Sequence, residues 1–474
     1  MRNRLYLTIM VFPSILLLMT CGFWTEENLL SGFADVGGPT VTAVPADGSR
    51  IDGSPNTIDL TFSEEVTGAD IAGNYSFSGA GAGSLSVSGV VPVSGTTYRL
   101  TFSGTPGSGG ITLTLSNILD LTGKPMEDDT VSYTGWWDTD WSARRRLTFD
   151  NTAQSSDLDG FSVMVRLNTG RVDYSRTQDV AQDIRFVDAD GTVLNHEIEV
   201  WNESGESTVW VRVPRVDGSS SSDHIYMYYG NAGASDSQNP TGVWDSDYLA
   251  VWHLNESPAG THYDSTGNDI DGTASGNTPY SSGPVRAQEF DGNNDCITMG
   301  DVNALDTPGY LTLSIGFYRH SDVNSATNHG IENVLLAQSS TSSNDNLEIG
   351  TDGNNIEMYV DTSGTDGPFT YNAGITNNTW YLVTFTYDQD DANEIKLYVA
   401  GSMVYETNSG SGTLSDSAAS PLTLGLARPG GSDWGDYEGI IDEVRISTSV
   451  RSDDWIAAQY LSQSDSFITF GAEE

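Results

Sequence analysis

Short runs of alternating apolar and polar residues recur along most of the chain. Residues 58–62 read Ile-Asp-Leu-Thr-Phe, residues 98–102 read Tyr-Arg-Leu-Thr-Phe, and residues 111–115 read Ile-Thr-Leu-Thr-Leu. A period of two places every second side chain on one face, which predicts half-buried β-strands. Turns rich in glycine, serine and proline separate these strands, as at residues 104–107. Strands at this spacing predict a β-sandwich, which we place at residues 39–134.

The same pattern continues through two further segments. In the segment 137–248, strands are predicted at residues 161–167, 184–187, 209–213 and 225–229, with tight turns at 188–191 and 230–231. The segment 249–470 is also β-rich, and one short helical turn is predicted near residues 452–460. We therefore expect an all-β fold of three consecutive β-sandwiches.

The start of the chain has the composition of a targeting segment. Arg2 and Arg4 precede an apolar run over residues 5–19, which is short for a membrane-spanning helix. The run ends in Leu-Met-Thr-Cys at residues 18–21, which resembles the lipobox of bacterial lipoproteins. That resemblance implies a signal segment at 1–21, a lipid on Cys21, a tether at 22–38, and a location in the bacterial cell envelope. The alternative is an ordinary secretory signal that contains a chance cysteine, and either reading predicts export.

Charge narrows the possible partners. The chain has 65 acidic and 20 basic residues, for a formal net charge of −45. Such a surface repels phosphate backbones and anionic headgroups, so we expect no nucleic acid partner and membrane contact through the lipid anchor only. The only cysteines are Cys21 and Cys296. If the first is acylated, no disulfide within the chain can form, and core burial must stabilise the fold.

Three sets of motifs resemble known families. The opening residues 39–41 and 47–48, Ser63-Glu64, and the closing residues 118–125 resemble a bacterial Ig-like domain, which implies a spacer. Residues 183–191, 196–201 and 226–231 resemble the domain of unknown function 2341, a surface domain that often precedes a laminin-G-like domain. That second resemblance covers about 137–248 and implies architecture rather than chemistry.

The third resemblance covers about 249–470. Its motifs are Val-Trp-His-Leu-Asn-Glu at 251–256, Asp-Ser-Thr-Gly-Asn at 264–268, residues 289–295, 380–388 and 395–401, and Gly-Ile-Ile-Asp-Glu-Val-Arg-Ile at 439–446. In this order they resemble a laminin-G-like, concanavalin-A-like lectin domain. The resemblance implies a jelly roll that binds glycan or an extracellular protein, and a packing or hydrogen-bonding role for the motif residue His253.

The same resemblance implies candidate site residues. It places Asp442 near a structural calcium, with Asp264 in the matching loop and Asn268 as a further ligand. Calcium takes six to eight oxygen ligands, whereas the alternative is that these residues cap tight turns without a metal. Trp434 and Tyr437 lie in the Gly- and Asp-rich stretch 429–438, where they could form a loop platform for sugars; core packing is the competing interpretation.

An acid pair raises the question of catalysis. Glu197 and Glu199 occupy positions i and i+2 of a predicted strand, so both would share a face. Laminarinase-type glycoside hydrolases carry a third acid in this pattern, but here that position is Trp201, and Glu203 is out of register. We therefore expect no catalysis, and we expect Gln substitutions of the pair to leave folding unchanged. A polysaccharide-degrading glycoside hydrolase and a purely structural envelope protein remain as alternatives to a binding protein.

Overall fold

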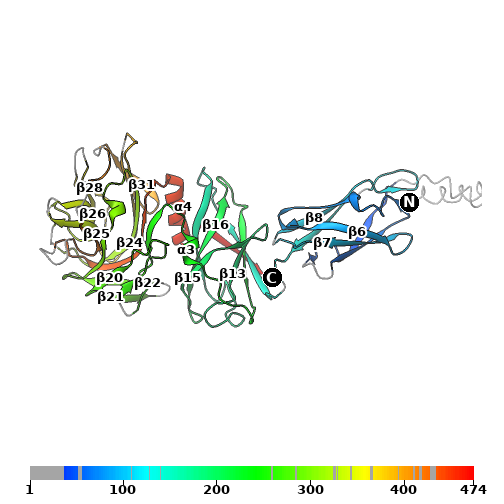
Figure 1. The fold of residues 1–474 in the computed structure, drawn as a ribbon, viewed down its shortest axis with the longest axis horizontal. Coiled ribbons are helices and arrows are strands. Elements are labelled where there is room, and N and C mark those ends of the chain that lie inside the picture. The colour runs from blue at the N-terminus through cyan, green and yellow to red at the C-terminus, as the bar shows by residue number, and fades with distance from the viewer. Residues whose placement is uncertain are drawn as a thin grey trace, which may run out of the picture. The chain divides into compact units, whose positions relative to one another are not determined.

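The computed structural model describes residues 37–474, except 52–55, 108, 127–128, 139, 258–259, 283–284, 324–326, 328, 342–343, 363–366, 393, 409–411, 416–418 and 428–433. The chain forms two compact units, Met1–Trp137 and Asp138–Glu474, and each is described by itself. Figure 1 labels their elements.

The first unit is a sandwich of two four-stranded sheets, ordered β1-β3-β7-β6 and β2-β10-β8-β5. Its strands are β1 (Val41–Val44), β2 (Arg50–Ile51), β3 (Thr57–Phe62), β5 (Tyr75–Ser78), β6 (Ser86–Pro92), β7 (Thr97–Ser103), β8 (Gly110–Leu115) and β10 (Thr130–Gly135). Ile58, Leu60 and Leu100 are fully buried between the sheets. Asp59 and Arg99, which alternate with them, form an ion pair of 2.6 Å on the outer face. The period-two pattern thus separates core from surface.

The second unit begins with a smaller sandwich, whose sheets are ordered β14-β13-β17-β11-β34 and β12-β16-β15. Its strands are β11 (Ala143–Phe149), β12 (Leu158–Leu167), β13 (Arg185–Asp188), β14 (Val193–Leu194), β15 (His196–Val200), β16 (Ser207–Val216), β17 (His224–Tyr229) and β34 (Ile468–Glu473). Apolar side chains of both sheets, among them Phe161, Val211 and Met227, form one core.

The end of the chain returns to this smaller sandwich. Helix α4 (Asp453–Gln463) is capped by Ser452, whose side chain accepts a hydrogen bond from the backbone of Trp455. The Trp455 ring packs edge-on against Phe161, with centroids 4.9 Å apart. After the helix, β34 pairs antiparallel with β11. The segment 249–470, which the sequence analysis treats as one domain, therefore gives its last elements to the core and the sheet of the preceding sandwich.

A larger sandwich lies between these segments. Its two sheets are ordered β21-β22-β33-β24-β29-β30-β31, with β18 also paired to β33, and β19-β20-β23-β32-β25-β26-β27-β28. The first sheet comprises β18 (Tyr248–Trp252), β21 (Thr278–Ser282), β22 (Val285–Asp291), β24 (Tyr310–Arg319), β29 (Trp380–Asp388), β30 (Ile395–Val399), β31 (Ser402–Thr407) and β33 (Glu438–Ser447). The second comprises β19 (Thr261–His262), β20 (Gly272–Ser275), β23 (Cys296–Asp301), β25 (Val334–Thr341), β26 (Asn344–Asp352), β27 (Asn355–Val360), β28 (Phe369–Asn372) and β32 (Pro421–Leu424).

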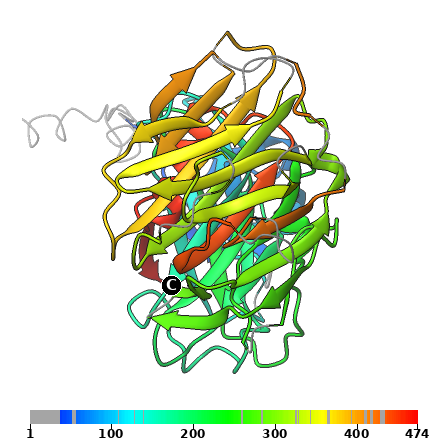
Figure 2. The same cartoon turned by 90° about the vertical axis from the view of Figure 1, so that its left-hand side faces the viewer.

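Figure 2 shows strands of this larger sandwich running side by side. Its core contains Trp252, Phe317, Phe385 and Ile441. The opposite face of the first sheet is only partly exposed to solvent, because α4 packs next to β31. The same helix also packs against β12 of the smaller sandwich. The smaller and larger sandwiches therefore meet over this face.

These elements confirm the predicted all-β class and its individual strands. Residues 58–62, 98–102 and 111–115 lie within β3, β7 and β8, and the helical turn predicted near 452–460 is part of α4. Among the described residues, no helix combines the length and the apolar composition needed to cross a membrane. The apolar run at 5–19 and Cys21 lie outside the described residues.

Candidate functional site

A β-bulge in β33 turns two consecutive acids to the same face of the sheet. The register between β24 and β33 shifts next to Gly316, which pairs with Asp442, and Glu443 has a positive φ of 51°. Ile441 and Val444 on either side both lie in the core. A regular strand would send one of two consecutive side chains into that core, whereas the extra residue of a bulge lets both point away from it.

His253 lies opposite this bulge. Trp252, the last residue of β18, pairs with Val444, so the residue that follows the strand reaches Glu443. Nδ1 of His253 is 2.7 Å from Oε1 of Glu443, and Nε2 is 3.4 Å from Oε2 of Glu197 in the smaller sandwich. The imidazole is 5% exposed. It therefore bridges carboxylates of two different sandwiches.

The predicted acid pair on β15 does converge on one place, but that place is buried. Glu197 accepts hydrogen bonds from Ser265 Oγ at 2.7 Å and Trp244 Nε1 at 3.1 Å. Glu199 accepts one from Trp210 Nε1 at 2.9 Å, and its side chain is 5% exposed. Both acids therefore face His253 of the larger sandwich rather than an open substrate site, and the effect of Gln substitutions on folding stays a prediction.

Arg445 completes the group. Its guanidinium donates to the second oxygen of Glu443. It also lies over the ring of Trp210, 4.3 Å from the centroid, and 5.2 Å from that of Trp244. The His253 ring stacks on Trp210 at 5.8 Å. We refer to Glu197, Glu199, His253, Glu443 and Arg445 as the Glu–His cluster.

Opposite charges outweigh burial for three members of this cluster. Burial lowers the pKa of His253, but Glu443 and Glu197 together raise that pKa well above its ordinary value. Burial raises the pKa of Glu443, but His253 and Arg445 bring it down to about 2. Burial also raises the pKa of Glu197, which His253 and the hydrogen bonds to its carboxylate hold below the ordinary range. These groups are charged in the folded protein.

The remaining acids keep their protons. Burial and then the charge of Glu443 raise the pKa of Glu199 to about 8. Burial, followed by Glu443 and Glu199, raises the pKa of Asp442 well above its ordinary value. At neutral pH the two anions of the Glu–His cluster are thus balanced by protonated His253 and by Arg445, which is always cationic.

The same groups also raise the question of a metal centre. Glu199, His253 and Glu443 present ligand atoms that lie within 4.8 Å of one another. However, both oxygens of Glu443 already accept bonds from His253 and Arg445, and Trp210 donates to Glu199. A metal ion would have to displace these cations. We therefore interpret the cluster as an ion network that joins the two sandwiches.

A second acidic group of similar spacing comprises Asp322, Glu332 and Asp352. The oxygens of Asp322 accept bonds from Arg319, Asn333 and the backbone of Gly353. The carboxylate of Asp322 therefore already accepts hydrogen bonds from three groups of the protein.

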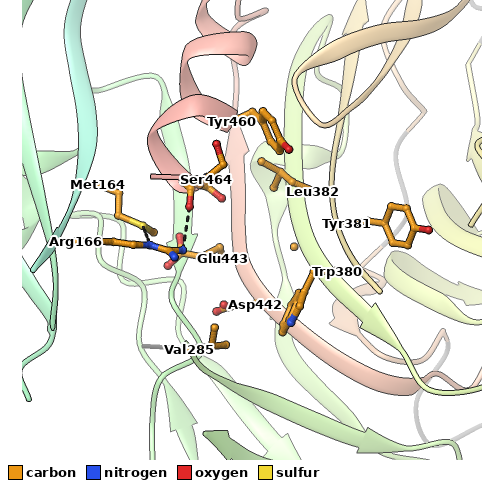
Figure 3. Close-up of a pocket in the computed structure, with 12 residues that line it drawn as sticks. Met164, Arg166, Val285, Trp380, Tyr381, Leu382, Asp442, Glu443, Tyr460 and Ser464 are labelled. Carbon is orange, nitrogen blue, oxygen red and sulfur yellow. Dashed lines mark hydrogen bonds between the residues drawn. The ribbon is translucent and has the colours of Figure 1, made fainter. Parts of the chain in front are cut away.

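A pocket of about 350 Å³ opens beside the Glu–His cluster (Figure 3). It is lined by β12 and α4 on one side and by β24, β29 and β33 on the other. The side chains that give it chemical character are Arg166, Trp380, Tyr381, Asp442, Glu443 and Tyr460. Concave sites of this size, with aromatic walls and a few polar groups, are typical of small-ligand binding.

The predicted calcium ligands lie in different settings. Asp264 accepts hydrogen bonds at both oxygens: from the backbones of Val251 and Thr266 at one, and from Thr266 Oγ1 and the backbone of Ile270 at the other. The Asn268 amide donates to the carbonyl of Leu249 at 2.9 Å. The acidic and histidine groups with metal-like spacing among the described residues include neither Asp264 nor Asp442. This geometry matches the turn-capping alternative.

A prediction follows for this loop. Asp264→Ala should lower the free energy of unfolding by about 1–3 kcal/mol, because buried donors lose their acceptor. The loss should be the same in calcium and in chelator, measured by chemical denaturation of the full chain. Asp190→Ala serves as the control, because this aspartate caps an exposed turn of the same unit. A calcium-dependent rise in stability that Asp264→Ala abolishes would instead support a bound ion.

The predicted sugar platform is not formed as expected. Tyr437 is 1% exposed, and its ring packs edge-on against Phe290 within the core. The core-packing alternative is therefore correct for Tyr437. Trp434 is partly exposed, and its backbone bridges to Ala427. Neither residue lines the pocket.

Sequence reasoning missed the aromatic and basic groups of that pocket. The available signal is the motif 380–388, whose first residue is Trp380. Arg166 and Tyr460 lie in other segments, where no motif marks them. Only the packing of α4 against β12 brings them to the same place.

Comparison with known proteins supports the second and third of the three resemblances, those of the segments 137–248 and 249–470. Residues 180–270 match the family model described as a domain of unknown function, DUF2341. Residues 291–457 match the model described as the concanavalin A-like lectin/glucanases superfamily. No curated protein matches the chain. The first match crosses the position 248/249 at which the sequence analysis divides the domains, and it includes both the β15 acids and His253.

Solved structures that match part of the chain include domain 4 of AbnA, a GH43 extracellular arabinanase from Geobacillus stearothermophilus, in complex with arabinotriose. It is 18% identical with a TM-score of 0.33, and the match covers 45% of this chain and 98% of that one. The binding domain of Paraclostridial Mosquitocidal Protein 1 is 16% identical with a TM-score of 0.37, over 46% and 52% of the two chains. The botulinum neurotoxin serotype D ligand-binding domain in complex with N-acetylneuraminic acid is 14% identical with a TM-score of 0.35, over 48% and 53%. The match thus spans about half the length of each toxin chain.

The chain therefore carries a DUF2341 region at residues 180–270, followed by a concanavalin A-like lectin/glucanase domain at residues 291–457.

Proposed function

We propose that this protein is an exported, envelope-anchored binding protein that recognises glycan through its concanavalin A-like domain. The observation that carries this proposal is the pocket beside the Glu–His cluster, where aromatic rings, an arginine and two acids surround about 350 Å³. Trp380 is 39% exposed although it is a large apolar side chain. Exposed rings offer a flat apolar surface to a sugar, while the polar groups fix its orientation. An extracellular protein ligand is the alternative partner.

The surface charge is consistent with this class of ligand. With a net charge of −45, the protein is poorly suited to polyanions such as nucleic acids. Sugars that are neutral or carry a single charge meet no such barrier, because charges farther apart than about 8 Å are largely screened at physiological salt.

One observation favours a different function, that of a glycoside hydrolase. Asp442 and Glu443 both line the pocket, and their environments push their pKa values in opposite directions. Such a split is common for catalytic acid and base pairs. However, His253 and Arg445 already occupy the oxygens of Glu443. A carboxylate nucleophile needs an oxygen directed at the sugar, so binding without hydrolysis is the better interpretation.

The experiment is a glycan array probed with the full chain, followed by titration calorimetry of the best ligands. Trp380→Ala should weaken binding, whereas Tyr263→Ala, which removes an exposed aromatic outside the pocket, should not. Reducing-sugar release from the bound glycans would show the hydrolase instead. If no glycan binds at concentrations up to the millimolar range, the glycan proposal fails and the structural-protein alternative gains support.

The envelope location has its own prediction. Cys21→Ser should move the protein from the detergent phase to the aqueous phase of a detergent partition, because a lipid chain buries its methylene groups in the micelle. Cys296→Ser, which changes the other cysteine, should leave the wild-type partition unchanged. Identical aqueous partition of wild type and Cys21→Ser would contradict the lipid anchor.

A further inference from the structure

The pocket belongs to both sandwiches of the second unit. Arg166 lies on β12 of the smaller sandwich, and Tyr460 lies on α4. Trp380 and Asp442 lie on β29 and β33 of the larger one. All four line the same pocket, and Figure 3 shows Arg166 on one side of it and Trp380 on the other. Any ligand held here therefore contacts both sandwiches of the second unit.

Arg166 is the cation of this pocket, and no acid neutralises it. One of its terminal nitrogens donates to the backbone carbonyl of Gln463 at 2.9 Å, and its Nε lies 3.5 Å from the sulfur of Met164. Among the described residues, no carboxylate oxygen lies within ion-pair distance of its guanidinium.

Neighbouring arginines on the same unit show the contrast. Arg171 pairs with Asp465 at 2.8 Å, Arg445 pairs with Glu443, and Arg451 pairs with Asp245 at 2.6 Å. Arg166 thus keeps donors that no acid of the described residues occupies, although acids outnumber bases in the chain by 65 to 20. A guanidinium with free donors is well suited to a carboxylate, which it binds through two parallel hydrogen bonds.

We propose that the pocket binds a sugar acid, such as a hexuronate within a glycan, and that Arg166 recognises the carboxylate of that sugar. This inference rests on the glycan-binding function proposed above and adds the class of sugar. The ring of the sugar lies against Trp380, and its hydroxyl groups meet Asp442.

The acids of the pocket do not prevent an anion from binding. The charge of Glu443 is neutralised locally by His253 and Arg445, which contact its two oxygens. Oδ1 of Asp442 is buried and has no hydrogen-bond partner among the described residues. Burial keeps this acid protonated by raising its pKa well above the ordinary value, so it adds no negative charge to the pocket. Arg166 therefore gives the pocket a net positive charge.

The test compares matched ligands on the full chain. Trigalacturonate, its methyl ester and galactotriose differ mainly in the carboxylate, and calorimetry at 150 mM salt measures their affinities. The free acid should bind about ten- to a hundredfold more tightly than the ester, as expected for hydrogen bonds between charged groups. Arg166→Gln should remove this preference and leave the weaker binding of the neutral trisaccharides. The melting temperature of Arg166→Gln is measured in parallel to verify that it folds.

Arg146→Gln is the matched control, because Arg146 also lacks a carboxylate partner among the described residues but lies outside the pocket. It should keep the wild-type preference. Equal affinity for the acid and its ester would overturn the sugar-acid assignment while leaving glycan binding intact. A preference for the acid that survives in a folded Arg166→Gln protein would overturn the role of Arg166. Tighter binding of a sulfated galactose than of galacturonate would show that the pocket prefers a sulfate to a carboxylate, which contradicts the sugar-acid assignment. If no saccharide binds at all, both this inference and the proposed function fail.

Discussion

Glu443→Gln is expected to destabilise the second unit by about 3 kcal/mol, the low end of the range for removing one partner of a buried ion pair. The substitution keeps the shape of the side chain but leaves protonated His253 and Arg445 beside an uncharged amide. Both cations are buried, at 5% and 2% side-chain exposure, so water cannot replace the lost charge. The free energy of unfolding of the full chain in urea, followed by tryptophan fluorescence, measures the effect.

The Glu–His cluster contains its own partial compensation. Glu199 lies 3.9 Å from Nδ1 of His253, and the charge of Glu443 is one reason why it keeps its proton. Without that charge, Glu199 can ionise and replace the lost anion. The double variant Glu199→Gln/Glu443→Gln cannot respond in this way, so its loss should exceed the sum of the two single losses.

Glu289→Gln provides the control for this prediction. Glu289 also pairs with a histidine, His320, at 3.1 Å, but the two side chains are 41% and 30% exposed. Exposed pairs contribute about 0–1 kcal/mol, so this variant should be nearly as stable as the wild type. A Glu443→Gln protein that is no less stable than Glu289→Gln would show that the cluster does not stabilise the contact between the sandwiches.

The second unit is expected to lose stability as the pH rises from about 5 to 8. Glu199 has a pKa of about 8 in the folded protein, against an ordinary value of 4.5. Between these values the unfolded chain has released the proton and the folded protein still holds it. Stability therefore falls with rising pH, by about 1.4 kcal/mol per pH unit for one proton. The raised pKa values of Asp442 and His253 act in the same direction.

At low pH the sign reverses. Glu443 has a pKa of about 2 in the folded protein, below its ordinary value of 4.5. Its stabilising contribution is complete above 4.5 and is lost as the pH falls toward 2. The second unit should therefore be most stable in mildly acidic solution, near pH 5.

Glu199→Gln isolates the alkaline effect. An amide resembles the protonated acid, and its oxygen can still accept the hydrogen bond from Trp210, so the variant should remain folded at pH 5. Between pH 5 and 8 the free energy of unfolding of this variant should fall less steeply than that of the wild type. The difference in slope should be about 1.4 kcal/mol per pH unit, which corresponds to one proton. Urea unfolding at pH 5, 6.5 and 8 measures this, with Glu289→Gln as the control that keeps the wild-type slope. If Glu199→Gln has the wild-type slope, Glu199 is ionised in the folded protein.

Some of the site could be found in the sequence. The motifs 251–256 and 439–446 contain His253, Glu443 and Arg445, and the i, i+2 spacing of Glu197 and Glu199 predicts that these two acids share a face. Their meeting place could not be found, because the spacing along the chain says nothing about which sandwich faces which. Their protonation could not be found either, since it depends on burial and on neighbours from other strands.

By itself, the sequence determined the local structure. Alternation with a period of two determined the strands and the all-β class, because the choice of face is made residue by residue along a strand. The order of the motifs determined the concanavalin A-like domain. Tertiary structure alone decided that β34 pairs with β11 from the other end of the unit, that the bulge at Glu443 turns both acids away from the core, and that Tyr437 packs inside. Each of these depends on contacts between residues far apart in sequence, where the free energy of burial, and not local preference, selects the partner.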